Sequence, residues 1–109
     1  MGEHTRTLGN IASVVRSKNA GPFWLTLDVF FRDDEDFEHV RRSNVLNAQN
    51  VGRLYLVDPA LVKVFELPEL RVVKISIPRQ AVAGSFEDSD LHGGQQHVPL
   101  ALLPVRVDA

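Results

Sequence analysis

The sequence contains no cysteine in its 109 residues. This absence excludes a disulfide scaffold, a thiolate zinc site, an iron–sulfur cluster and a cysteine nucleophile. An excess of basic residues is also missing, because the formal net charge is -2 and the isoelectric point is about 6.0. General binders of nucleic acid or of anionic membranes usually carry a basic excess or a basic stripe. We therefore expect neither nucleic acid nor membrane among the partners.

Long apolar runs are absent as well. No run approaches the roughly 20 residues that a transmembrane helix needs. No apolar signal region follows the stretch Met1–Arg6, so we expect a cytoplasmic location. The length predicts one domain, 1–109, with a frayed terminus over residues 1–7. A hydrophobic fraction of 44% is ordinary for a soluble domain whose core needs no metal or disulfide.

Residues 16–22, Arg-Ser-Lys-Asn-Ala-Gly-Pro, are the most informative stretch. A turn between two apolar runs requires only part of it: a permissive glycine, an asparagine that tolerates a left-handed backbone, and a proline at the exit. The two cations and the hydroxyl are additional, and they suit a carboxylate or a phosphate. We interpret the stretch as an anion-binding loop, with a purely structural turn as the alternative. The candidate ligand-binding residues here are Arg16, Ser17, Lys18, Asn19 and Gly21.

Residues 23–31, Phe-Trp-Leu-Thr-Leu-Asp-Val-Phe-Phe, predict a strand, because they are rich in aromatic and β-branched residues. Both faces would be largely apolar, so the strand is expected to be central in a sheet. Asp28 is the exception on its face. We expect it to lie near solvent at the strand end; the alternative is a buried carboxylate that faces the cations of the loop.

The other elements follow from capping residues and periodicity. Leu8–Val15 fits either a short helix or a strand, and we favour the strand because it would make residues 16–22 a loop. Asp33 or Asp34 can cap a helix with an acidic first turn, and Asn47 can cap a second helix. Further strands are predicted over residues 61–67, 70–77 and 104–107, and a short helix within residues 95–103.

From residue 22 onward this order is β-α-β-β-α-β, which is the order of a ferredoxin-like α+β sandwich. One segment precedes that unit. Residues 80–96 form a long irregular stretch, which we interpret as a functional flap that folds back on the first loop. The predicted fold is therefore a ferredoxin-like α+β sandwich with an extra N-terminal segment and a C-terminal flap.

The flap carries a second group of polar residues. An Asp-x-His spacing with a further histidine five residues on could hold a metal, but the spacing is not diagnostic, and we expect no metal and no cofactor. A histidine here has a suitable intrinsic pKa for acid–base work, although no nucleophile can be assigned beside it. The metal hypothesis concerns Asp88, Asp90, His92 and His97, and the candidate ligand-binding residues are Asp90, Gly94, Gln95, Gln96 and His97.

The stretch 16–22, together with residues 25–28, 77–79, 84–85 and 90–100, resembles a bacterial and plant family, domain of unknown function 4387. The resemblance implies a small companion of the acyclic-terpene-utilisation (AtuA-type) proteins, either free or fused behind that larger domain. Residues 12–21 and 65–70 are also similar in style to a ferredoxin-fold domain at the end of some AtuA-type proteins. The sequence departs from that domain at Asn19, where the other has an acid, so no role of that acid carries over.

Three functions are consistent with these features. The first is a small subunit of a larger AtuA-type catabolic protein that contributes a loop for a carboxylate or an acyl-thioester. The second is a stand-alone enzyme on a carboxylate or acyl-CoA substrate, with Lys18 or His97 as the catalytic candidate. The third is a ferredoxin-like module that binds a small molecule, which is an analogy at the level of the fold alone. A homo-oligomer is compatible with each of them.

Overall fold

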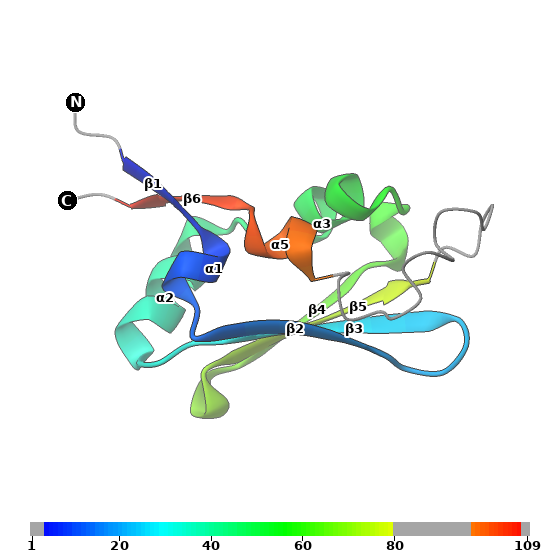
Figure 1. Ribbon diagram of the computed structural model, residues 1–109, viewed down its shortest axis with the longest axis horizontal. Coiled ribbons are helices and arrows are strands. Elements are labelled where there is room, and N and C mark those ends of the chain that lie inside the picture. Colours follow the sequence, from blue (N-terminus) through cyan, green and yellow to red (C-terminus); the bar gives the residue numbers. More distant parts are fainter. Residues whose placement is uncertain (1–3, 80–96, 108–109) are drawn as a thin grey trace.

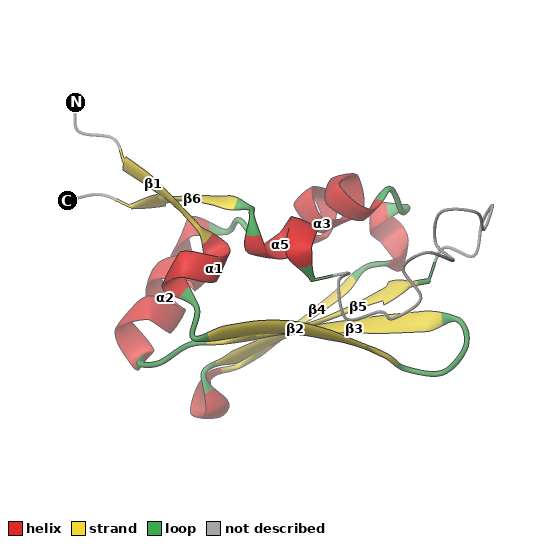
Figure 2. Cartoon of the chain, viewed as in Figure 1, coloured by secondary structure: helices red, strands yellow, loops and turns green. Residues whose placement is uncertain are grey.

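The computed structural model describes residues 4–79 and 97–107. It is an α+β structure in which a four-stranded antiparallel sheet carries its helices on one face (Figures 1 and 2). The strands are β1 (His4–Thr7), β2 (Val14–Asn19), β3 (Trp24–Phe30), β4 (Lys63–Leu67), β5 (Val72–Pro78) and β6 (Pro104–Val107). The helices are α1 (Leu8–Ile11), α2 (Asp34–Ser43), α3 (Ala48–Tyr55) and α5 (Val98–Ala101), with single 3-10 turns η1 (Pro59–Leu61) and η2 (Pro68–Leu70).

The order of the main sheet is β2-β3-β5-β4, with each neighbouring pair antiparallel. In a ferredoxin-like β-α-β-β-α-β unit that begins with β3, the last strand, here β6, would pair with the free side of β3 and form the edge of the sheet. Instead β2 occupies that edge, and β6 pairs with β1 in a separate two-stranded sheet. The α+β class is confirmed, whereas the predicted ferredoxin-like topology is not. β3 is central, as its apolar faces predicted.

The first segment differs most from the sequence prediction. Of the frayed terminus predicted over residues 1–7, residues 1–3 lie outside the described residues, whereas His4–Thr7 form strand β1, because β6 pairs with all four of them. We favoured a strand over Leu8–Val15, but Leu8–Ile11 form a helical turn, and only Val14 and Val15 of that range belong to a strand, as the start of β2. Leu8 and Ile11 are buried there, so the helical spacing of these two side chains is the pattern that the fold uses.

The predicted helices are confirmed with their caps. The Asp33 carboxylate accepts a hydrogen bond from the backbone N–H of Asp36 at 2.9 Å and starts α2. The Asn47 side chain accepts from the N–H of Asn50 at 2.7 Å and starts α3. Helix α2 ends where Asn44 turns to a left-handed backbone. These caps satisfy backbone donors that have no partner within the helix.

The core lies between the helices and one face of the sheet. Alternate residues of β3 and β5 point into it, where they meet Phe37 and Val40 of α2, Val51 of α3 and Leu100 of α5. His39 connects α2 to the two-stranded sheet, because its ring Nε2 lies 2.9 Å from the carbonyl oxygen of Arg106 in β6. We call the side of the four-stranded sheet on which the helices pack the helix-covered face. Within residues 4–79 and 97–107, no helix is both long and apolar enough to cross a membrane.

Candidate functional site

The opposite side of the sheet, here called the open face, has no described helix lying on it (Figure 1). Residues directly opposite each other in an antiparallel pair point to the same side, so the strand register defines the rows of this face. One row across the four strands holds two cations around a carboxylate, and the next holds two hydroxyls between two lysines. The rows are Val14–Phe30–Val72–Leu67, Arg16–Asp28–Lys74–Phe65, Lys18–Thr26–Ser76–Lys63 and, across two strands, Trp24–Pro78.

Asp28 is the centre of the open face. Its carboxylate Oδ1 accepts a hydrogen bond from the Lys74 ammonium at 3.1 Å, and its Oδ2 lies 3.8 Å from Arg16 Nε. Asp28 is only 2% exposed, whereas the side chains of Arg16 and Lys74 are 58% and 43% exposed. A buried carboxylate is stable only with such partners, because an unpaired buried charge costs several kcal/mol.

This geometry corrects the expectation that Asp28 lies near solvent. The alternative was nearer to the structure, since Asp28 is buried and faces Arg16. Its closer partner, Lys74, comes from β5 and not from the segment that precedes β3. No local pattern indicates that partner, because the Asp28↔Lys74 register depends on the pairing of two strands far apart in the chain.

Arg16 is held in place from two sides. Its guanidinium carbon lies 4.8 Å from the centre of the Phe30 ring, and its Nε faces Asp28. A guanidinium has five N–H donors in a fixed planar fork, and the Arg16 side chain is 58% exposed, so donors that do not face Asp28 are accessible to a ligand. The arrangement is suited to bidentate binding of a carboxylate, because the side chain is already ordered before the ligand arrives.

The neighbouring row is polar across all four strands. Thr26 and Ser76 are a directly opposed pair, and both are half-buried. Lys18 and Lys63 stand at the two ends of the row and are exposed. Since the whole sequence contains three lysines, at positions 18, 63 and 74, every lysine of the chain lies on the open face. With Arg16 they place four cations around the Asp28 carboxylate in the described strands of this face, although the chain as a whole has a net charge of -2.

The structure divides the predicted loop between the two faces. Arg16 to Asn19 belong to β2, so the expected loop over residues 16–22 is confined to the turn around Gly21, whose φ of 84° favours glycine. Alternation along β2 directs Arg16 and Lys18 to the open face and Ser17 and Asn19 to the other. The structure therefore brings together the two cations and separates them from the hydroxyl and the amide.

The second predicted group lies mostly outside the described residues. This applies to the flap over residues 80–96 and to Asp88, Asp90, His92, Gly94, Gln95 and Gln96. His97 is described, and it is the N-cap residue of α5 on the helix-covered side of the sheet. The described structure thus places His97 and Lys18, the two catalytic candidates, on different sides of the sheet.

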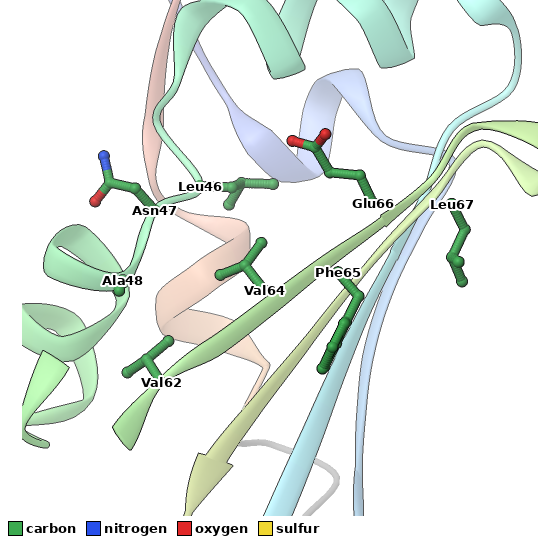
Figure 3. A pocket seen from close by; sticks show the side chains of 8 residues that line it. All are labelled: Leu46, Asn47, Ala48, Val62, Val64, Phe65, Glu66 and Leu67. Carbon is green, nitrogen blue, oxygen red and sulfur yellow. The ribbon is translucent and has the colours of Figure 1, made fainter. Parts of the chain in front are cut away.

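A shallow groove runs along the outer edge of β4 (Figure 3). It measures about 640 Å³, and it is lined by Leu46, Asn47, Ala48, Val62, Val64, Phe65, Glu66 and Leu67. Figure 3 shows Glu66 directed toward the helices, whereas Phe65 and Leu67 point to the other side of the strand. Phe65 is 50% exposed and extends the open face to the edge of the sheet.

Metal binding gains no support from the described residues. Within residues 4–79 and 97–107, no three His, Asp or Glu side chains are close enough together to hold an ion. The acidic run 33–36 instead serves the N-terminus of α2, where carboxylates are favourable beside the positive end of the helix dipole.

Among the titratable groups, Tyr55 and Arg41 are shifted for reasons that concern the fold. Burial raises the pKa of the Tyr55 phenol, and the backbone N–H of Leu100 donates to its oxygen at 3.2 Å, which opposes the shift. The hydrogen bond and charge of Glu38 raise the pKa of the exposed Arg41. Neither group faces the open face.

Comparison with models of protein families identifies the family of this chain. The family model described as "Domain of unknown function (DUF4387)" matches residues 8–104. The chain belongs to this family. No curated protein and no solved structure matches it. The DUF4387 match extends from α1 into β6, so it includes every strand that contributes to the open face.

Several residues of the open face were missed by sequence reasoning. Lys63, Lys74, Thr26 and Ser76 each alternate with apolar neighbours along their own strands, which is ordinary for a half-buried strand. Only the register of four strands shows that these residues meet Arg16 and Lys18 on one face. Alternation was the available signal, but it does not reveal which strands are neighbours.

Proposed function

We propose that this DUF4387 chain is a small accessory subunit that works with a larger AtuA-type catabolic protein and contributes an anion-binding surface. The group that this surface binds would be a carboxylate or an acyl-thioester. It would belong either to a substrate or to the partner protein. The observation that carries the proposal is the row Arg16–Asp28–Lys74 on an open face. The AtuA-type partner is inferred from the family resemblance.

The charge and shape of the open face support a binding role. Asp28 neutralises one charge, which leaves a net excess of positive charge among the exposed cations of the face. Trp24, Phe65 and Val14 are 37%, 50% and 47% exposed around them. A face with ordered cations and exposed apolar side chains favours a partner that presents carboxylates on an apolar surface. This assigns the row Arg16–Asp28–Lys74 to an acidic and apolar surface of the larger protein.

The stand-alone enzyme is less favoured by the geometry. Lys18 lies on the open face and His97 on the helix-covered side, so the sheet stands between the two catalytic candidates. Each would have to act without the other. The small-molecule module remains consistent with the open face and shares its anion-binding chemistry.

Co-expression with the AtuA-type protein tests the proposal. We expect the two chains to purify together and light scattering to give the mass of a complex. Arg16→Glu should abolish the complex, because it reverses the charge beside Asp28. Arg42→Glu is the matched control, since Arg42 is an exposed arginine in the last turn of α2. Two separate species with the wild-type chain, or a complex that tolerates Arg16→Glu, would contradict the proposal.

A further inference from the structure

The row Lys18–Thr26–Ser76–Lys63 is not explained by the Asp28 cluster. Within the described ranges, neither Lys18 nor Lys63 forms an ion pair, whereas Lys74 is paired with Asp28. Among the residues that the structure describes, the two outer lysines therefore flank a hydroxyl pair without a carboxylate partner. From these four side chains together with Trp24, we infer a second subsite on the open face.

The four polar side chains can converge on one small anion. Lys18 and Lys63 lie three strand spacings apart, which is roughly 14 Å, and a lysine reaches over about 6 Å with its flexible stem. Both ammonium groups can therefore bend toward the Thr26–Ser76 pair, whose hydroxyls are the donors nearest the sheet. Two ammonium groups and two hydroxyls supply the donors that a phosphate group accepts.

Trp24 lies beside this row on the same strand. It is two residues from Thr26, which places it roughly 7 Å along β3 and on the same side. It is 37% exposed and faces Pro78 across the strand pair, so the two rings make a small apolar surface next to the phosphate donors. Indole is the strongest stacking side chain for an aromatic ring.

We propose that this subsite binds a mononucleotide, with the phosphate between Lys18 and Lys63 and the base stacked on Trp24. The step of about 7 Å from Trp24 to Thr26 suits the short separation of base and phosphate within one nucleotide. A long nucleic acid is disfavoured, because the chain is acidic overall and the cations occupy a single patch. The inference goes beyond the proposed function, because it assigns a small ligand to the row next to the one that the partner protein would contact.

Fluorescence gives a direct test, because Trp24 is the only tryptophan in the sequence. We would titrate the protein with ADP, inorganic pyrophosphate and adenosine. The proposal predicts that ADP quenches Trp24 emission with saturation, that pyrophosphate competes with ADP, and that adenosine binds at least tenfold more weakly. Lys18→Ser and Lys63→Ser should each weaken ADP binding about tenfold, the effect of one lost charge-assisted contact. Arg42→Ser is the control and should leave ADP binding unchanged.

Calorimetry separates the ring from the phosphate. Trp24→Leu should weaken ADP about tenfold or more and leave pyrophosphate unchanged. ADP binding no tighter than adenosine, or binding that survives the double change Lys18→Ser and Lys63→Ser, would overturn the inference. Affinity that rises with oligonucleotide length would overturn it in favour of a single-stranded nucleic acid. These outcomes are independent of complex formation, so a chain that binds ADP alone but no AtuA-type protein would refute only the proposed function.

Discussion

The Lys74 ammonium donates a hydrogen bond to Asp28 at 3.1 Å, across two neighbouring strands of the central sheet. Asp28 is buried on the face of the sheet that no described helix covers. Its second cation, Arg16, comes from the strand on the other side. The carboxylate therefore fixes the positions of two cations that remain partly exposed to solvent.

The two cations should differ in their effect on stability. We expect Lys74→Met to lower the free energy of unfolding by about 1–3 kcal/mol, because it removes the hydrogen bond to a buried carboxylate. Arg16→Met should cost less, since the Arg16–Asp28 separation is 3.8 Å and the side chain is largely exposed. Urea unfolding measures both. An Arg16→Met chain that is the less stable of the two would contradict the assignment of Lys74 as the main partner.

The sequence predicted this cluster only in part, and the reason is physical. Local signals were sufficient for the caps Asp33 and Asn47 and for the central strand. The position of β6 beside β1, and not at the edge of the main sheet, depends on pairing over about a hundred residues. Pairing at that distance has no local sequence signal, because both β2 and β6 are short strands that could occupy the same edge.

The helix caps supply a second prediction. Asp33→Ala and Asn47→Ala should each lower the free energy of unfolding by about 1 kcal/mol, because each leaves a backbone N–H of the first helical turn without its acceptor. Asn47→Ala should cost more, since its side-chain amide also donates to the carbonyl of Asn44 at 2.7 Å. Asp33→Asn is the conservative control and should recover most of the loss. Thermal unfolding of the variants in parallel gives the comparison.

Gly52 tests the packing of α3 against the segment that follows it. A Cβ at this position would lie 2.8 Å from the carbonyl oxygen of Val57, so Gly52→Ala requires the backbone to move. We expect a loss of about 1–3 kcal/mol, although alanine is otherwise the better helix former. Gly21→Ala meets no neighbouring atom and should cost about 1 kcal/mol, through its positive φ alone. A Gly52→Ala chain as stable as the wild type would contradict this prediction, because it would show that the backbone at Val57 moves aside without a loss of stability.

Tyr55 gives a prediction about pH. Burial raises the pKa of its phenol in the folded chain above the value of about 10 in the unfolded chain. Its contribution to stability is therefore complete below about pH 10, and it decreases as the pH rises further, because the unfolded chain loses the proton first. Tyr55→Phe should remove this part of the alkaline decrease while costing about 1 kcal/mol at neutral pH, where Leu100 loses its acceptor. Parallel slopes for the two chains above pH 10 would contradict the shift.

If the open face is the surface by which this chain binds, its three lysines allow a direct measurement of that binding. Amine-reactive labelling, read residue by residue by mass spectrometry, would compare the free chain with the chain co-purified with its AtuA-type partner. Because Lys18, Lys63 and Lys74 all lie on the open face, we expect all three to be modified in the free chain and protected in the complex. Equal modification of the three lysines in the free and the partner-bound chain would contradict it.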